Sequence, residues 1–311
     1  MLYDVHTHVG LDTGFFLRGW WPYASTARDL LDRMDENGID RAVCFPFTLP
    51  SAFDPYAFKR AELKLLDGRF PFDVENQLLA DEIERVDTRK QLLQFAMFDP
   101  ARCVAHQVKS IASLVSKIAG LKTQTTVLQS PIRHLLDSAR DLMALAEQHD
   151  LPVLFHTSIN PKDIWAQASD CLDVAKAFPK VRFNLAHSLR FHAPLLKRAK
   201  QMPNVWIDCS AHLNHCKLAT ENSIVVPPAG TRVDADFNDP VGAMLAVHDM
   251  IGERYLWGSD NPFMSWCDDK LRLLFSYKQE ADVLHVLPSE VKESMADRAP
   301  RAWLFGNKET P

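Results

Sequence analysis

Several features of membrane and secreted proteins are missing from this 311-residue chain. No run approaches the roughly 18 apolar residues of a membrane-spanning helix, and no basic leader with an apolar signal core precedes the first predicted strand. The six cysteines include no Cys-x-x-Cys pair and no dense framework, so we expect reduced thiols that pack as small apolar groups. These absences predict a cytoplasmic protein without a membrane partner.

Excess positive charge and glycine-rich phosphate loops are also lacking. The formal net charge of -5 gives no electrostatic basis for binding nucleic acid or anionic membranes. No Gly-x-Gly-x-x-Gly follows a predicted strand, so a dinucleotide site has no support. With 47% apolar and 24% charged residues, the chain has the composition of a globular protein with a large core. We expect a small-molecule substrate.

What the chain does contain is a regular alternation of short apolar strands and helices. Predicted strands cover about residues 1–8, 41–48, 92–98, 121–126, 152–157, 181–186, 205–209 and 255–259. Predicted helices cover about 27–37, 75–86, 104–118, 135–149, 162–178, 194–202, 240–251, 270–281 and 289–298.

This alternation implies an α/β fold with a parallel sheet and right-handed crossovers. Eight strand–helix units in about 300 residues favour a closed (β/α)8 TIM barrel, although an open doubly wound sheet stays an alternative. No composition break marks a second domain. We therefore predict one domain over residues 1–311, with long loops after the first, second and seventh strands.

Metal-competent side chains recur at the ends of the predicted strands. His6 and His8 are two residues apart on a strand, so both imidazoles face the same side. Such a pair alone is common by chance, but His156, His187 and Asp260 end three later strands. In a barrel these carboxyl ends converge at one mouth, where catalytic groups collect. Three neutral imidazoles and one carboxylate leave an open coordination position, as in catalytic sites for zinc or a similar ion.

Short segments spread over nearly the whole chain carry a further pattern. They are 4–8 (DVHTH), 95–100 (FAMFDP), 120–122 (GLK), 151–157 (LPVLFHT), 184–188 (NLAHS), 205–210 (VWIDCS), 257–263 (WGSDNPF) and 301–306 (RAWLFG). In their residues and in their order along the chain, these segments resemble those of the amidohydrolase superfamily. Within it, they are similar to the amidohydrolase-related family that includes aminocarboxymuconate-semialdehyde decarboxylase.

The resemblance implies that one divalent ion is bound by four residues: His6, His8, His156 and Asp260. Zinc is the expected ion, with manganese or another divalent ion as alternatives. The resemblance further implies that Asp260 takes a proton from metal-bound water and that His187 hydrogen-bonds the substrate oxygen or leaving group. Two other interpretations of His187 stay open, namely a packed strand-end residue and a fifth ligand.

Lys122 requires a separate interpretation, because an alternating strand points it inward together with Gln124. In binuclear members of the superfamily a carboxylated lysine bridges two metal ions. The family that this sequence resembles often has a lysine at this position and uses a single metal ion. Three roles therefore stay open: a carboxylated bridge to a second metal, a charge facing the substrate, and a structural ion pair. In each case a buried lysine needs a partner.

Loop residues at the same end of the barrel are candidates to contact the substrate. They are Arg18, Trp20, Trp21, Arg190, Arg232, His212 and His215. An arginine can hold a carboxylate through two parallel hydrogen bonds, which suggests a small carboxylated or cyclic substrate. The aromatic residues of these loops could instead form a plug or a subunit contact, so a homo-oligomer stays open.

Two enzymatic functions fit these residues. We favour a metal-dependent hydrolase that attacks an amide, lactone or ester carbonyl, because the Asp4-x-His6-x-His8 motif with His187 and Asp260 is the general pattern. The alternative is a non-oxidative decarboxylase of an aromatic or unsaturated acid, built on the same ligands. A catalytically silent binding barrel would require degraded ligands, and every expected ligand is present.

Overall fold

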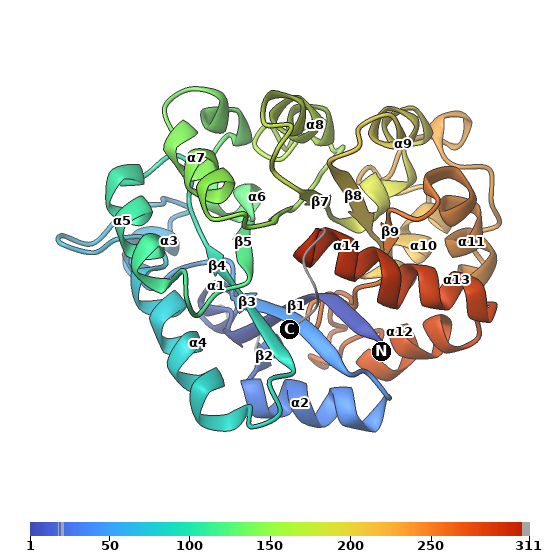
Figure 1. Ribbon diagram of the computed structural model, residues 1–311, viewed down its shortest axis with the longest axis horizontal. Helices are drawn as coiled ribbons and strands as arrows, with labels where there is room; N and C mark the ends of the chain where they lie inside the picture. The colour runs from blue at the N-terminus through green and yellow to red at the C-terminus, as the bar shows by residue number, and fades with distance from the viewer. Residues whose placement is uncertain (18, 20–21, 307–311) are drawn as a thin grey trace.

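The fold is a curled, mostly parallel sheet whose strands alternate with helices (Figure 1). The computed structural model describes residues 1–17, 19 and 22–306. Within these residues the strand order is β2-β1-β3-β4-β5-β6-β7-β8-β9, and only β1 and β2 pair antiparallel. The strand bounds are β1 Tyr3–Leu11, β2 Ala24–Ser25, β3 Arg41–Pro46, β4 Leu92–Met97, β5 Gly120–Thr123, β6 Val153–Phe155, β7 Phe183–Leu185, β8 Val205–Asp208 and β9 Tyr255–Leu256.

The two ends of this sheet meet along β1. The backbone nitrogen of Val5 donates to the carbonyl oxygen of Trp257 at 3.2 Å, and that of Asp260 donates to the carbonyl oxygen of His6 at 2.8 Å. The segment that follows β9 therefore runs beside β1 and closes the barrel. The predicted TIM-barrel fold is confirmed, and β2 is an additional edge strand that pairs with the end of β1.

Helices surround the barrel (Figure 1). The α-helices are α1 Thr13–Phe16, α2 Ala27–Glu36, α3 Pro55–Phe58, α4 Asp73–Val86, α5 Val104–Leu114, α6 Thr125–Leu128, α7 Arg140–Gln148, α8 Ala168–Ala177, α9 Ala193–Lys200, α10 His212–Thr220, α11 Pro240–Ile251, α12 Tyr277–His285, α13 Ser289–Glu293 and α14 Ala299–Phe305. Shorter helical turns are η1 Ile132–Leu136, η2 His187–Phe191, η3 Ala229–Thr231 and η4 Ser294–Arg298.

Helix α2 shows how the sequence specifies these elements. The side chain of Thr26 accepts a hydrogen bond from the backbone nitrogen of Asp29, and the Asp29 carboxylate accepts one from the backbone nitrogen of Thr26. This capping box begins the helix where the apolar stripe begins. The stripe itself is buried, as predicted: Ala27, Leu30, Leu31 and Met34.

The fourth predicted strand is too long. β5 ends at Thr123, and α6 begins at Thr125. The side-chain oxygen of Gln124 accepts a hydrogen bond from the backbone nitrogen of Val127 at 2.7 Å and thereby caps α6. The β-branched Thr125 and Thr126 favour a strand by propensity, and the cap overrides that preference.

Helix α10 lies where the sequence predicts only a polar connection after the seventh strand. It has no apolar stripe because polar and small side chains are buried on it, including His212, Asn214, His215 and Cys216. Periodicity cannot detect a helix of this kind. His212 and His215 therefore lie on a helix and not in a loop.

Two further predicted helices start too early. α8 begins at Ala168, six residues after the predicted start, because Asp163 accepts hydrogen bonds from Trp165 and Ala166 and holds a turn there. α12 begins at Tyr277 instead of about residue 270, after the N-cap Ser276. A side-chain capping box sets the start of α12, whereas α8 starts after the turn held by Asp163 and has no side-chain cap of its own.

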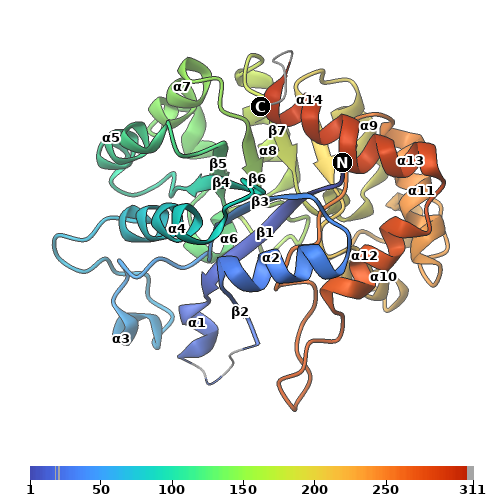
Figure 2. The same cartoon turned by 60° about the horizontal axis from the view of Figure 1, so that its bottom comes forward.

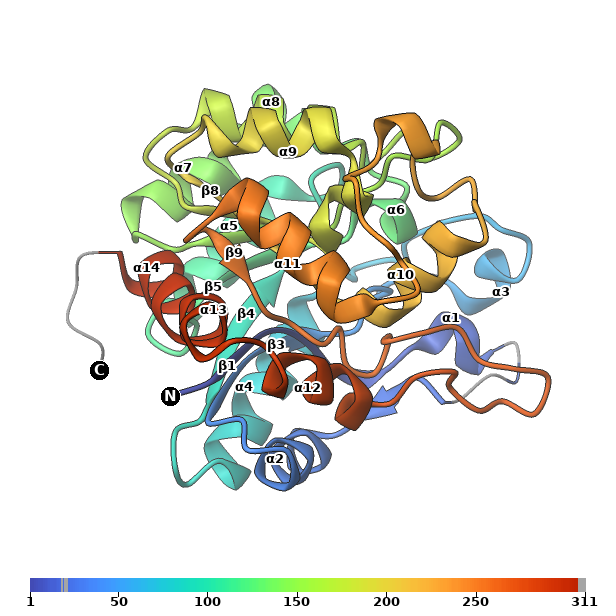
Figure 3. The ribbon, with the colours of Figure 1, turned by 90° about the vertical axis from the view of Figure 1, so that its right-hand side faces the viewer.

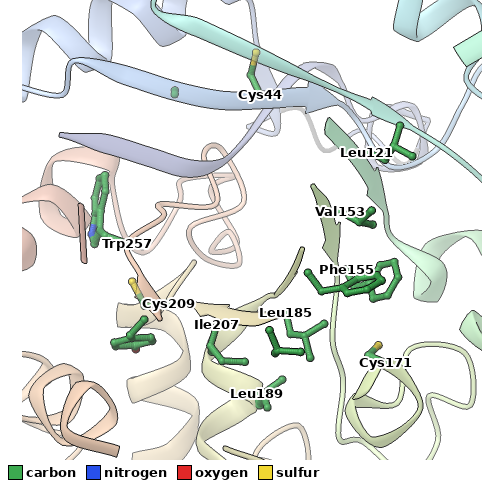
Figure 4. Close-up of a cluster of buried hydrophobic side chains, with 14 of the residues drawn as sticks. Cys44, Leu121, Val153, Phe155, Cys171, Leu185, Leu189, Ile207, Cys209 and Trp257 are labelled. Carbon is green, nitrogen blue, oxygen red and sulfur yellow. The ribbon is translucent and has the colours of Figure 1, made fainter. Parts of the chain in front are cut away.

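Apolar side chains between the sheet and the surrounding helices form the larger core. Figure 4 shows Leu121, Val153, Phe155, Leu185 and Ile207 pointing away from the strands into this layer, beside three thiols. These thiols are Cys44, Cys171 and Cys209. All three are buried, as is Cys216, so these four thiols pack as apolar groups as predicted. For the other two the prediction is wrong, because Cys103 is exposed and Cys267 is half-buried.

The inside of the barrel is apolar at one end and polar at the other. At the amino-terminal end of the strands, Trp303 of α14 packs against Phe95 with ring centroids 5.3 Å apart. Phe45 lies further along the interior, 5.2 Å from the ring of His6. The apolar interior therefore forms a floor beneath the polar residues at the carboxyl ends of the strands.

Loops gather at that carboxyl end. Figures 2 and 3 show α1, α3 and the loop before α12 projecting from one end of the molecule, while the N-terminus lies toward the other. Within the described residues, no helix combines the length and the apolar character needed to span a membrane.

Candidate metal centre

The predicted site residues surround one cavity of about 330 Å³, which we call the central cavity. His6 and His8 lie in β1, and His156 directly follows β6. His187 begins η2 after β7, and Asp260 follows β9. The structure therefore brings all five residues together, as the convergence of strand ends predicts.

Three of these residues offer ligand atoms that lie within 4.8 Å of one another: His6, His187 and Asp260. The Nε2 atoms of His6 and His8 are 3.2 and 3.3 Å from the same atom, Oδ1 of Asp260. Two atoms that coordinate one tetrahedral zinc ion are about 3.4 Å apart. This spacing is that of a metal site.

The hydrogen bonds of His6 show which nitrogen keeps its lone pair. Nδ1 lies 3.1 Å from Oδ2 of Asp208, so Nδ1 carries the proton and donates it to that carboxylate. Nε2 then directs its lone pair toward Oδ1 of Asp260, 3.2 Å away. Two electron-rich atoms at this distance need a proton or a cation beside them, and a divalent ion can supply that positive charge to both. The donor set therefore fits a metal such as zinc.

His187 is oriented differently from His6. Its Nδ1 lies 3.0 Å from the carbonyl oxygen of Ser210, an acceptor that places the proton on Nδ1. Nε2 then accepts a hydrogen bond from Nδ1 of His156 at 3.0 Å. Because Nδ1 is also the His187 nitrogen that lies 3.9 Å from Asp260, this geometry favours a hydrogen-bonding role for His187 over that of a fifth ligand. That His156 binds metal stays a prediction.

Asp208 is a site residue that the strand-end argument misses. It ends β8 and is fully buried. Besides the His6 ring, its carboxylate accepts hydrogen bonds from Asn184 Nδ2 at 2.8 Å and from the backbone nitrogen of His187 at 3.1 Å. The signal available in the sequence is a single carboxylate inside an apolar strand, because a buried charge must have partners.

Burial keeps the imidazoles neutral. Desolvation, with a further contribution from Lys122, lowers the pKa of His6 to about 4. The pKa values of His8, His156 and His187 also lie well below the usual 6.5, chiefly because of burial. Neutral imidazoles have the lone pair that a metal ligand needs.

Lys122 lies at the metal-site end of β5 and is fully buried. Its Nζ is 3.4 Å from Nε2 of His6 and 4.9 Å from the centroid of the Phe45 ring. No carboxylate of the described residues lies within 4.0 Å of this Nζ, which argues against a structural ion pair. Burial lowers the pKa of Lys122 to about 7. The substrate-facing and bridging roles both stay open.

The two histidines of α10 occupy different surroundings. His215 lines the central cavity, and its Nε2 contacts Nη1 of Arg190. His212 does not line the cavity, because its Nε2 donates to the carbonyl oxygen of Pro240 at 2.8 Å. His212 therefore has a structural contact between α10 and the start of α11.

The arginines proposed to hold a carboxylate also have different surroundings in the structure. Arg190 lines the central cavity. Arg232 donates to Asn222 and to the carbonyl oxygen of Ala219, and it does not line the cavity. The remaining candidates lie outside the described residues: Arg18, Trp20 and Trp21.

One wall of the central cavity is aromatic. The ring of Phe263 lies 5.0 Å from that of His8, 5.3 Å from Phe47 and 4.9 Å from Tyr23, measured between centroids. Sequence reasoning looks for such a wall after β1 and misses Phe263. Its position three residues after Asp260 is the signal that could have identified it.

Sequence comparison identifies one family. A family model described as Amidohydrolase matches residues 3–305. No curated protein matches the chain in a sequence search.

Solved structures with similar folds cover nearly the whole chain. A 5-carboxyvanillate decarboxylase from Sphingomonas paucimobilis has a TM-score of 0.64 and 13% identity, covering 97% of this chain and 98% of its own. A 2,6-dihydroxybenzoate decarboxylase from Rhizobium has a TM-score of 0.63 and 14% identity, with 98% and 99% covered. An amidohydrolase from Burkholderia multivorans with bound zinc has a TM-score of 0.61 and 13% identity, with the same coverage.

Proposed function

Since the chain belongs to the amidohydrolase family, we propose that it is a metal-dependent, non-oxidative decarboxylase of a small aromatic carboxylic acid. The observation that carries this proposal is Lys122, a buried amine beside His6 with no carboxylate within 4.0 Å among the described residues, which a bound anion would hold in its charged form. A substrate carboxylate is the natural counter-charge for such a cation. Likeness in fold to two decarboxylases supports this reaction over the hydrolysis that the motifs alone favour.

The size and lining of the central cavity support a single-ring substrate. Its volume of about 330 Å³ is near the lower end of the range for small-molecule sites. Val127, Leu218 and Phe263 supply apolar surface along the cavity, against which a flat ring can pack.

We assign the metal to His6, His8, His156 and Asp260. The shared Asp260 oxygen supports His6 and His8, whereas Nε2 of His156 faces Arg190 at 3.4 Å and would have to turn toward the ion. When bound, a divalent ion supplies positive charge that stabilises the negative charge developing on the substrate. Asp208 orients His6 for this role through its hydrogen bond to Nδ1.

Residues of the chain bind the substrate, transfer the proton and exclude water. Lys122 binds the scissile carboxylate and directs it toward the metal-site residues. As the bond between ring carbon and carboxylate carbon breaks, carbon dioxide leaves and the ring carbon takes up a proton. Asp260 lines the cavity, and its carboxylate can pass this proton from water to the ring carbon. Phe263, which packs against Phe47, reduces the access of water to the ring.

The test is product analysis with metal-loaded protein in deuterated water. Hydroxylated benzoates are offered alongside their amides, esters and lactones. We expect carbon dioxide release from the free acids and one deuterium at the vacated ring position, detected by NMR. Hydrolysis of an amide, ester or lactone, with the free acids returned intact, would overturn the decarboxylase and establish the hydrolase.

A further inference from the structure

Arg190 lies on a strained turn beside the central cavity. Five consecutive non-glycine residues of η2, His187 to Phe191, have φ between 45° and 65°. Side chains disfavour this left-handed conformation, and strained backbone of this kind concentrates at functional sites. The turn places His187 and Arg190 on the lining of the same cavity.

Neutral acceptors hold the Arg190 guanidinium in a fixed orientation. Nε and Nη2 donate to the carbonyl oxygen of Thr157 at 3.2 and 2.9 Å. Nη2 also lies 3.4 Å from Nε2 of His156, and Nη1 contacts Nε2 of His215. The guanidinium is thereby positioned before any ligand arrives.

None of these contacts neutralises the charge of Arg190. An imidazole nitrogen that accepts a hydrogen bond keeps its lone pair, so His156 and His215 contact Arg190 through uncharged acceptor nitrogens. Within the described part of the chain, no carboxylate lies within 4.0 Å of the guanidinium. Asp260 and Asp163 also line the cavity and act on this charge from beyond that distance, so the guanidinium has no carboxylate in direct contact.

Arg190 and Lys122 form two separate cationic points in the cavity. Lys122 borders His6, whereas Arg190 borders His156 and His215. The ring of His156 in turn packs against His187, with centroids 4.7 Å apart. A single carboxylate beside Lys122 and the metal-site residues leaves Arg190 for another anionic group.

We propose that Arg190 binds a second acidic group of the substrate, a carboxylate distinct from the carboxylate beside Lys122. The inference rests on the proposed function for the first carboxylate and adds that the substrate ring carries two acidic groups. Beyond the contacts described above, one N–H of Nη1 is left to donate a charge-assisted hydrogen bond to that group.

The experiment measures binding to the metal-loaded protein by isothermal titration calorimetry. The probes are the three benzenedicarboxylate isomers and the monoamide of each, which differ in one negative charge and little in shape. We expect at least one diacid to bind about tenfold or more tightly than its monoamide. Equal binding of diacid and monoamide for all three isomers would overturn the proposal.

Two variants connect this preference to Arg190. Arg190→Gln should abolish the difference between diacid and monoamide, while Arg232→Gln should preserve it, because Arg232 lies outside the cavity lining. An unchanged preference in Arg190→Gln would overturn the proposal. If that variant does not fold, Arg190→Lys replaces it: a reduced preference supports the assignment, and an unchanged one contradicts it.

The readout separates this inference from the proposed function. A diacid preference that is lost in Arg190→Gln supports the second anionic site even if no acid is decarboxylated. If the enzyme releases carbon dioxide but Arg190→Gln keeps the preference for diacid over monoamide, the role of Arg190 is wrong and the proposed decarboxylase function stands.

Discussion

Nδ1 of His6 lies 3.1 Å from Oδ2 of Asp208, a carboxylate that is fully buried. This hydrogen bond fixes the proton on Nδ1 and turns the lone pair of Nε2 toward Asp260. The same carboxylate accepts from the backbone nitrogen of His187 at 3.1 Å. The geometry of the candidate metal centre therefore depends on a residue that does not itself face the metal position.

Asp208→Asn should weaken metal binding about ten- to hundredfold, because an amide holds the His6 ring less firmly and makes its Nε2 a weaker donor. Metal affinity is measured by competition with a chromophoric chelator. Asp163→Asn is the matched control, since this buried cavity carboxylate accepts from Thr126 Oγ1 at 2.6 Å and not from a predicted ligand. Equal affinities in wild type and Asp208→Asn would contradict the account.

Gly258→Ala should displace His6, because the added methyl group would clash with it. A Cβ at position 258 would lie 2.9 Å from Cβ of His6, in a fully packed region where neither atom can move freely. We expect a loss of about 1–3 kcal/mol in unfolding free energy of the metal-free protein, together with weaker metal binding. Gly230→Ala serves as control, because an added Cβ there meets no atom within 4 Å. Identical urea midpoints for the two variants would refute the predicted clash.

His187→Asn should retain the metal and lose turnover. The nitrogen nearest to Asp260 donates to Ser210, which makes His187 a poor ligand, while its other nitrogen holds the ring of His156. Metal per chain is measured by elemental analysis beside carbon dioxide release. His156→Asn should lose metal under the same conditions. Loss of metal in His187→Asn would instead identify His187 as a ligand.

The buried His212 should make stability depend on pH. Burial lowers its pKa to about 4, whereas the imidazole of the unfolded chain keeps a value near 6.5. Below pH 6.5 the unfolded state binds the extra proton, so this contribution is complete above 6.5 and is lost as the pH falls toward 4. Between pH 7.5 and 5, the unfolding free energy of wild type should fall about 2 kcal/mol more than that of His212→Gln.

Urea unfolding of both proteins at each pH, in the same metal state, provides this comparison. Other buried histidines contribute equally to wild type and variant, so the difference isolates His212. Parallel pH profiles for the two proteins would show that His212 does not titrate as its burial implies.

Most of the metal centre could be predicted from the sequence, because a barrel brings its strand ends to one mouth whatever the exact length of each strand. His156, His187 and Asp260 only had to follow strand ends for their side chains to meet at one mouth. Strand ends are visible in sequence as apolar runs that stop at a polar residue. The five predicted residues therefore came together even where strand lengths differed from prediction.

Other features depend on tertiary contacts that no local pattern encodes. The partners of Asp208 come from β1 and from residues in and just after β7, far from it in sequence. The direction of Arg190 follows from a left-handed turn without glycine, which turn propensities do not anticipate. Helix α10 has no apolar stripe because its polar side chains are buried. One domain over 1–311, a cytoplasmic location and the oligomeric state stay predictions.

The most direct test of the account is the metal content per chain of protein purified without added metal or chelator. We expect about one zinc, manganese or similar divalent ion per chain, and its loss in an Asp260→Ala variant. About two ions per chain would assign Lys122 to a carboxylated bridge. A chain that binds no metal even after reconstitution would contradict the central claim that His6, His8, His156 and Asp260 form a metal centre.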